Sequence, residues 1–273
     1  MTALRVATYN IHHGADGRDR GDLPRTAAAL AALDADVIGV QEVDVGFGTR
    51  SAHEDQPARL AELLGYQGCF GATLDRPASA GGARARYGLA LLTRGQILTH
   101  EMRLLPGDPR RPSAHEPRGL LSVRLRSPQG ADLTVLVTHL DPAHRHHRAA
   151  QVQAILDTAE ALEGPRVLLG DLNTDPAAPE LVALATGGWR EAAAELVGPL
   201  AGRPLVTRLV AALPGRPLRA TFPSRLPLRR LDSVWVHDGA RVEALEVGRS
   251  HASDHRGVVA SIRLPQSSSI VGP

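Results

Sequence analysis

Carboxylate, amide and imidazole side chains recur in this sequence at the ends of short apolar runs. The positions are Asn10, Glu42, His139, Asp171, Asn173, Asp232 and the adjacent pair Asp254 and His255. Each apolar run predicts a buried strand, and α/β sheets build their ligand sites at strand ends. Carboxylates and amides without cysteine favour a hard cation, Mg²⁺ or Mn²⁺, over zinc. Imidazoles beside such a cation would supply proton transfers.

Asp171 and Asn173 are the most informative of these residues. They directly follow the apolar run 167–169 and Gly170. Alternation along an extended backbone would turn both side chains to one face and Leu172 back to the core. The spacing therefore predicts that Asp171 and Asn173 converge on one metal ion or phosphate.

Each of these positions also has a simpler interpretation. Asn10 and Asp232, taken singly, read as turn or strand caps, because Asn and Asp bond readily to nearby backbone. The pair Asp254 and His255 is harder to dismiss, since it places a hard oxygen ligand beside a group that titrates near neutrality. Asp232 could orient one of the imidazoles, as a carboxylate partner does in other hydrolases.

The surrounding pattern predicts elements that deliver these side chains. Strands are expected at 4–9 and 36–40, the second ending at Gln41 and Glu42, with helices at 23–33, 56–64 and 144–162. Consecutive strands at 89–93, 98–104, 120–125 and 133–138 predict antiparallel pairing within a mixed sheet. Strands at 231–236, 242–247 and 258–264 close the domain, and the segment 75–86 is a candidate mobile loop.

Composition excludes several classes of protein. The chain has 273 residues, of which 43% are hydrophobic and 22% charged, and no apolar stretch is long enough to be a transmembrane segment. The N-terminus lacks the pattern of a signal peptide, so a cytoplasmic location is expected, and the single cysteine, Cys69, is expected in the core. An aromatic fraction of 3% argues against a stacking platform for single strands.

Six short motifs, taken in order, resemble the endonuclease/exonuclease/phosphatase superfamily of metal-dependent phosphoesterases, which includes deoxyribonuclease I, AP endonucleases and sphingomyelinases. They are Tyr9-Asn10-Ile11-His12-His13-Gly14, Gln41-Glu42-Val43-Asp44, Thr138-His139-Leu140-Asp141, Gly170-Asp171-Leu172-Asn173, Leu231-Asp232 and Ser253-Asp254-His255. The resemblance implies an α/β fold, a four-layer α/β sandwich of two mixed β-sheets packed face to face with helices outside. The catalytic domain would span residues 1–265, and 266–273 would be a disordered tail.

The resemblance also implies a role for each residue. Glu42 would be the principal metal ligand, with Asn10 and Asp254 near the Mg²⁺ or Mn²⁺ ion, directly or through water. Asp171 would orient or deprotonate the attacking water, and Asn173 would hydrogen-bond the phosphoryl group. His255, oriented by Asp232, would be a general base or stabilise the transition state. His139 would bind phosphate or act as the acid.

Other features bear on the substrate. Arg118, Arg229 and Arg230 are the best candidates for phosphate contacts among the arginines, since they lie near strand ends. Gly88-Leu89-Ala90 stands where many relatives have Gly-Asn-Ala, so no phosphate contact is expected from Leu89. His144, His146 and His147 could bind zinc, but solvation is the expected state because no partner carboxylate is evident.

The sequence thus predicts a metal-dependent phosphoric ester hydrolase in which water attacks phosphorus in line. Its partner would be a phosphate-ester substrate, most simply a phosphodiester. Two alternatives stay open: an endonuclease or exonuclease acting on DNA, and a non-catalytic phosphate-binding module on the same fold. A net charge of +2 does not demand a nucleic-acid partner. The sequence leaves the oligomeric state open.

Overall fold

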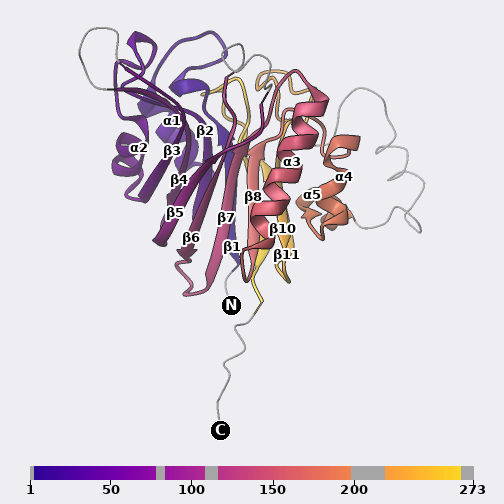
Figure 1. Ribbon diagram of the computed structural model, residues 1–273. Helices are drawn as coiled ribbons and strands as arrows, with labels where there is room; N and C mark the ends of the chain where they lie inside the picture. The colour runs from indigo at the N-terminus through magenta and orange to yellow at the C-terminus, as the bar shows by residue number, and fades with distance from the viewer. Residues whose placement is uncertain (1–2, 78–83, 108–115, 198–218, 266–273) are drawn as a thin grey trace.

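Two six-stranded mixed sheets form the centre of the computed structural model, which describes residues 3–77, 84–107, 116–197 and 219–265 (Figure 1). The first sheet has the order β11-β12-β1-β2-β4-β3 and the second β5-β6-β7-β8-β10-β9. The first sheet comprises β1 (Leu4–Asn10), β2 (Val37–Val45), β3 (Gln67–Arg76), β4 (Ala85–Thr93), β11 (Arg241–Val247) and β12 (Val258–Arg263). The second comprises β5 (Gln96–Leu104), β6 (Gly119–Arg126), β7 (Asp132–His139), β8 (Arg166–Asp171), β9 (Arg190–Glu191) and β10 (Asp232–His237).

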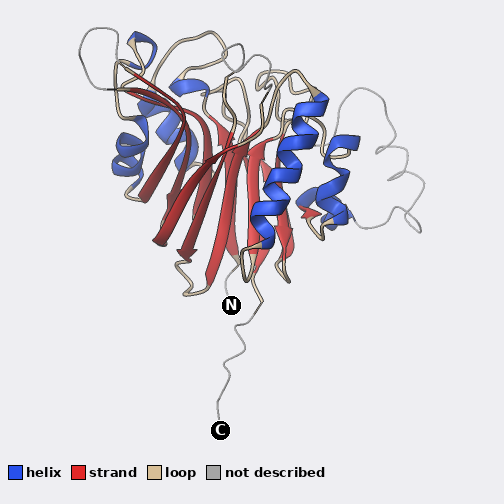
Figure 2. Ribbon diagram, in the orientation of Figure 1, coloured by secondary structure: helices blue, strands red, loops and turns tan. Residues whose placement is uncertain are grey.

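Helices cover the outer face of each sheet (Figure 2). They are α1 (Leu23–Ala31), α2 (Gln56–Leu64), α3 (Arg145–Glu160), α4 (Val182–Thr186) and α5 (Ala192–Val197). Leu30 of α1 and Leu60 of α2 join the core on the outside of the first sheet, and Val152 and Ile155 of α3 join the core on the outside of the second. A third core lies between the sheets, so the predicted four-layer sandwich is confirmed.

Local sequence explains how the first two helices begin and end. Asp22 and Asp55 cap α1 and α2, their side chains accepting from the backbone N–H of Arg25 and Ala58 respectively. A proline occupies the first turn of each helix, where its missing N–H has no intrahelical partner to lose. Gly65 ends α2 with φ of 67°, a left-handed conformation that favours glycine.

Most predicted elements are present with small shifts at their ends. The proposed tail at 266–273 lies outside the described residues, as does 78–83 within the candidate mobile loop. Within the described part of the chain, no helix is long and apolar enough to cross a membrane.

The two sheets approach each other closely at Gly39 in β2. A Cβ atom there would lie 3.1 Å from the Cβ of Leu169 in β8 and 3.1 Å from both methyl groups of Val137 in β7. A larger side chain would therefore fit only if Leu169 and Val137 moved by a few tenths of an ångström. This contact lies beneath the strand ends that carry Asn10 and Asp171.

Gly39→Val should lower the free energy of unfolding by about 1–3 kcal/mol, because the added methyl groups overpack the space between the sheets. Urea unfolding followed by circular dichroism measures the loss. Gly107→Val is the matched control, since Gly107 is exposed and a Cβ atom added there would meet nothing within 4 Å. Equal stability of the two variants would show that the sheets do not depend on this contact.

Candidate active site

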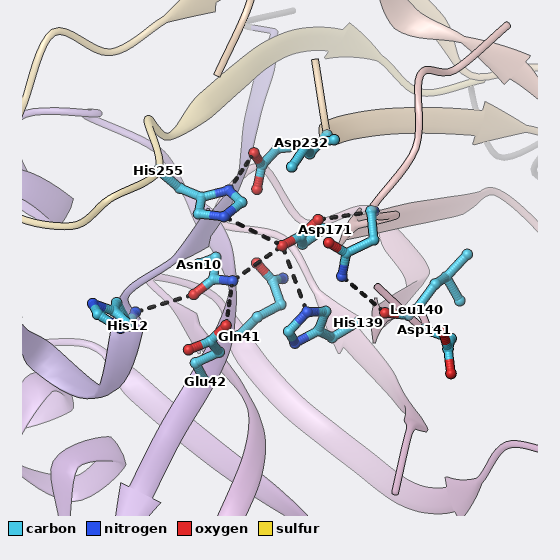
Figure 3. Close-up of polar contacts among 12 residues, drawn as sticks. Asn10, His12, Gln41, Glu42, His139, Leu140, Asp141, Asp171, Asp232 and His255 are labelled. Atoms are coloured by element: carbon cyan, nitrogen blue, oxygen red, sulfur yellow. Dashed lines mark hydrogen bonds and ion pairs between the residues drawn. The ribbon is translucent and has the colours of Figure 1, made fainter. Parts of the chain in front are cut away.

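Asp171 is the residue around which the polar side chains gather (Figure 3). It ends β8, and its register partners are His139 on parallel β7 and Asp232 on antiparallel β10. Three functional residues therefore stand at one level across three neighbouring strands. The Asp171 side chain is almost fully buried, with 1% of the residue exposed.

Both carboxylate oxygens of Asp171 have close partners. Its Oδ2 accepts a hydrogen bond from Asn10 Nδ2 at 3.1 Å and lies 3.5 Å from His139 Nε2 and 3.6 Å from His255 Nε2. Its Oδ1 accepts from the backbone N–H of Asn173 at 2.9 Å. Burial raises the pKa of Asp171, but the two imidazoles and the Asn10 amide outweigh burial and lower it. Asp171 is therefore a carboxylate at neutral pH.

Asn10 joins the two sheets through its side-chain amide. Besides Asp171, the same Nδ2 donates to Glu42 Oε1 at 2.8 Å, while Oδ1 accepts from the backbone N–H of His12 at 3.0 Å. The opposite amide orientation would set an oxygen against two carboxylates, so this one is fixed. The amide thus orients Glu42 and Asp171, and its oxygen is directed to backbone.

Glu42 does not stand at the end of a strand, contrary to the sequence expectation. β2 continues to Val45, and the pairs Val40↔Ala90 and Val43↔Gly88 enclose one extra residue on β2. Glu42 lies in this β-bulge with φ of 58°, which is uncommon for a residue other than glycine. The bulge directs its carboxylate to Asn10 at the active-site end of the sandwich.

Glu42 and Asp254 are the partly exposed carboxylates of the group, whereas Asp171 and Asp232 are buried. Burial and the negative charges of Asp171 and Asp254 raise the pKa of Glu42, against the hydrogen bond from Asn10. A divalent cation would relieve that repulsion, and carboxylate oxygens are the ligands Mg²⁺ and Mn²⁺ prefer. The donor set therefore fits a hard cation held by Glu42 and Asp254.

The two imidazoles carry different charges. His255 Nδ1 lies 2.8 Å from Asp232 Oδ2. Burial lowers the pKa of His255, but Asp232 and Asp171 outweigh burial and raise it to about 10, so the ring is an imidazolium at neutral pH. Burial and the positive charge of Arg118 lower the pKa of His139 to about 3, so that ring is neutral.

Strand alternation was expected to place Asn173 beside Asp171, but a different contact does so. The strand ends at Asp171, and Asn173 has φ of 54°, so strand alternation does not set its direction. Its Nδ2 donates to the carbonyl of Leu140 at 2.9 Å, which ties it to the end of β7. Leu172 is buried in the outer core, as predicted.

Two of the arginines proposed for phosphate contacts, Arg118 and Arg230, have different surroundings. Arg118 lies beside His139 in a small pocket and pairs with Glu116 at 2.9 Å. Arg230 pairs with Glu191 of β9, whose register partner is Trp235, three residues along β10 from Asp232. That ion pair engages the Arg230 guanidinium, and the phosphate contact expected of Arg230 stays a prediction.

Three other arginines line a cavity of about 510 Å³: Arg219, Arg225 and Arg256. Arg256 follows His255 directly, and its Nε donates to the carbonyl of Ser224 at 2.6 Å. The lining of this cavity contains no carboxylate among the described residues. The lining of this cavity therefore suits an anionic group.

Two hydroxyl groups hold residues of the active site in place, although serine and threonine were not among the candidate site residues. Thr221 Oγ1 accepts from the backbone N–H of Leu231 at 3.1 Å and of Asp232 at 3.3 Å. Ser253 Oγ lies 2.7 Å from the Asn10 carbonyl, to which it donates, and 3.1 Å from Asp254 Oδ1. Ser253 belongs to one of the six motifs, whereas Thr221 belongs to none of them.

Comparison with known proteins agrees with this arrangement. The model of the Endonuclease/Exonuclease/phosphatase family matches residues 7–255. A solved endonuclease/exonuclease/phosphatase from Beutenbergia cavernae has 26% sequence identity and a TM-score of 0.74, over 97% of this chain and 72% of that one. No protein of curated function matches the sequence significantly.

Two more distant structures share the fold. The mannosyl-6-phosphatase Bt3783 of Bacteroides thetaiotaomicron is 18% identical with a TM-score of 0.68, over 96% of this chain and 100% of that one. The human Nocturnin catalytic domain with bound sulfate is 19% identical with a TM-score of 0.65, over 97% and 94%.

Asp232→Asn should lower the pKa of His255 from about 10 toward its ordinary value, because the neutral amide no longer stabilises the imidazolium. In the wild type, the stabilisation from charged His255 is fully present below about pH 6.5 and is lost as the pH rises through 10. The variant should therefore have a lower free energy of unfolding than the wild type at about pH 6.5, and this difference should shrink as the pH rises to 10. NMR titration of the imidazole in EDTA-treated protein measures the shift. Unchanged titration of His255 would contradict the assigned pairing.

Proposed function

The chain belongs to the endonuclease/exonuclease/phosphatase family, whose members are metal-dependent phosphoesterases and nucleases, and we propose that it hydrolyses phosphodiesters with Mg²⁺ or Mn²⁺. One observation carries the proposal. The Asn10 amide contacts both Glu42, which is suited to a cation, and Asp171, which lies between two imidazoles. Cation, nucleophile and phosphate would therefore be assembled within one hydrogen-bonded group.

Each residue has a role that follows from its surroundings. Glu42 and Asp254 would hold the cation, which when bound supplies charge neutralisation at phosphorus. Asn10 would keep Glu42 and Asp171 in place. Asp171 would orient the attacking water and accept its proton, since its carboxylate is ionised.

The two histidines divide the remaining work. His255 is positively charged, so in the metal-free protein it is suited to stabilise a negatively charged transition state rather than to act as base. His139 is neutral and lies with Arg118, so this pair would contact the phosphoryl oxygens or the leaving group. Asn173 would donate its remaining amide hydrogen to the phosphoryl group.

Glu42→Gln should reduce kcat for bis(p-nitrophenyl) phosphate at least about 100-fold, because the neutral amide holds the cation poorly. EDTA should abolish wild-type activity, and added Mg²⁺ or Mn²⁺ should restore it. Glu62→Gln, on the exposed surface of α2, is the matched control. Activity that survives chelation or Asp254→Ala would rule out the metal-dependent mechanism, and inactivity of the wild type with every phosphoester would favour the binding module.

A nuclease is the second candidate, because the cavity lined by Arg219, Arg225 and Arg256 could take a second phosphate of a strand. On this alternative Arg225→Ala should raise KM for an oligonucleotide several-fold. The slope of the logarithm of the binding constant against the logarithm of salt concentration should become smaller by about one. Hydrolysis of bis(p-nitrophenyl) phosphate should be unaffected. Arg263→Ala is the control, since Arg263 pairs with Glu243 on the first sheet. An equal effect of Arg225→Ala on both substrates would count against a second phosphate.

Substrate class is best resolved by direct comparison. Plasmid DNA, abasic duplex, phosphoinositides and sphingomyelin would be assayed side by side with the same metal. Cleavage of DNA alone would select the nuclease, and cleavage of a headgroup alone would select the smaller phosphoester.

A further inference from the structure

A second group of metal-binding side chains lies at the start of α3. Asp141, His144 and His147 place one ligand atom each within 4.8 Å of one another. His147 Nδ1 lies 3.1 Å from Asp141 Oδ2, and His144 Nδ1 lies 3.5 Å from Asp141 Oδ1. The sequence suggested solvated histidines without a carboxylate partner, and that expectation is wrong, because Asp141 is the partner and His147 is only 8% exposed.

Hydrogen bonds fix the orientation of the Asp141 carboxylate without a bound ion. Asp141 Oδ1 accepts from the backbone N–H of Ala143 at 2.8 Å and of His144 at 2.6 Å. The Asp141 backbone is fixed on both sides, because its N–H donates to Gln151 Oε1 and its carbonyl accepts from Arg148 Nη1. Oδ2 is left facing His147. A metal would therefore meet a preorganised oxygen with little ordering cost.

The three ligand groups lie close enough to reach one ion. Ligands bound to Zn²⁺ at 2.0–2.2 Å with tetrahedral angles stand about 3.3–3.6 Å apart. His147 Nδ1 lies 3.1 Å from Asp141 Oδ2 and His144 Nδ1 lies 3.5 Å from Asp141 Oδ1, so each nitrogen approaches a different oxygen, and the ligand atoms of the three residues lie within 4.8 Å of one another. Small side-chain adjustments would bring them to this spacing. His147 lies in the first turn of α3, and His144 is the residue that precedes the helix, with an extended backbone that brings its ring to the same carboxylate.

The donor chemistry differs from that of the catalytic group. Two imidazoles and one carboxylate favour a borderline ion such as Zn²⁺, whereas Glu42 and Asp254 offer only hard oxygens. We propose that Asp141, His144 and His147 form a Zn²⁺ site separate from the catalytic cation site. Three protein ligands leave one position for water or another donor.

The proposed Zn²⁺ site lies at the connection between β7 and α3, close to the active site. Asp141 is two residues beyond His139, and the carbonyl of the intervening Leu140 accepts from Asn173. A Zn²⁺ ion would clamp the connection between β7 and α3 and so brace two residues of the active site from outside. By mass action it would also stabilise the folded protein.

The test measures Zn²⁺ binding rather than hydrolysis, so its result is independent of the proposed function. Full-length protein that carries Glu42→Gln is titrated with ZnCl₂ in excess Mg²⁺, in competition with a chromophoric chelator. The substitution and the Mg²⁺ suppress Zn²⁺ binding at the catalytic group. Adding His144→Ala or His147→Ala should weaken the Zn²⁺ affinity at least about 10-fold. His146→Ala is the matched control, since His146 is exposed and its ring lies 4.2 Å from His147 without belonging to the ligand group.

A second readout guards against misfolding. ZnCl₂ should raise the melting temperature of the Glu42→Gln protein and of its His146→Ala variant but not that of its His144→Ala variant, which alters the more exposed of the two ligands. Equal Zn²⁺ affinity with and without His144→Ala would overturn the proposal. So would equal weakening by His146→Ala, or the absence of Zn²⁺ binding to Glu42→Gln protein.

Discussion

Two carboxylates that repel each other, one from each sheet, share a single amide group. Asn10 donates to Glu42 on the first sheet and to Asp171 on the second, and its own carbonyl oxygen is held by backbone. Within the described part of the chain, no other side chain donates to both carboxylates. Removing the amide would leave the carboxyl groups of Glu42 and Asp171 close together without a shared donor, in a site where burial weakens solvent screening. The geometry of the site therefore depends on this side chain.

The shared amide requires the sheets to be close, and the packing beneath it meets that requirement. Gly39 allows β2 to approach β7 and β8, so the ends of β1 and β8 come within hydrogen-bonding distance of each other. Burial and neighbouring charges then determine the charge of each histidine. His255, between two carboxylates, is charged, and His139, beside Arg118, is neutral. Position in the sandwich thus decides which imidazole can act as an acid.

Sequence reasoning located the strand ends well because the apolar runs are short and separated by clear turn residues. Asn10, His139 and Asp171 all end strands, and Asp232 begins one. Glu42 was placed at a strand end in error, because a bulge adds one residue without interrupting the apolar pattern on either side. The partners of Arg230 and His147 could not be foreseen either. Glu191 is 39 residues from Arg230, and Asp141 belongs to the motif that carries His139, which does not indicate its contact with His147.

The bulge in β2 also has a meaning for how such a protein can evolve. Ile38, Val40 and Val43 all face the same outer core, although Val40 and Val43 are three residues apart, because the bulge shifts the alternation by one. Deleting Glu42 would restore plain alternation and leave Ile38, Val40 and Val43 on their present face. The family fold could therefore lose the carboxylate that suits a cation through a single in-frame codon deletion, without repacking its core.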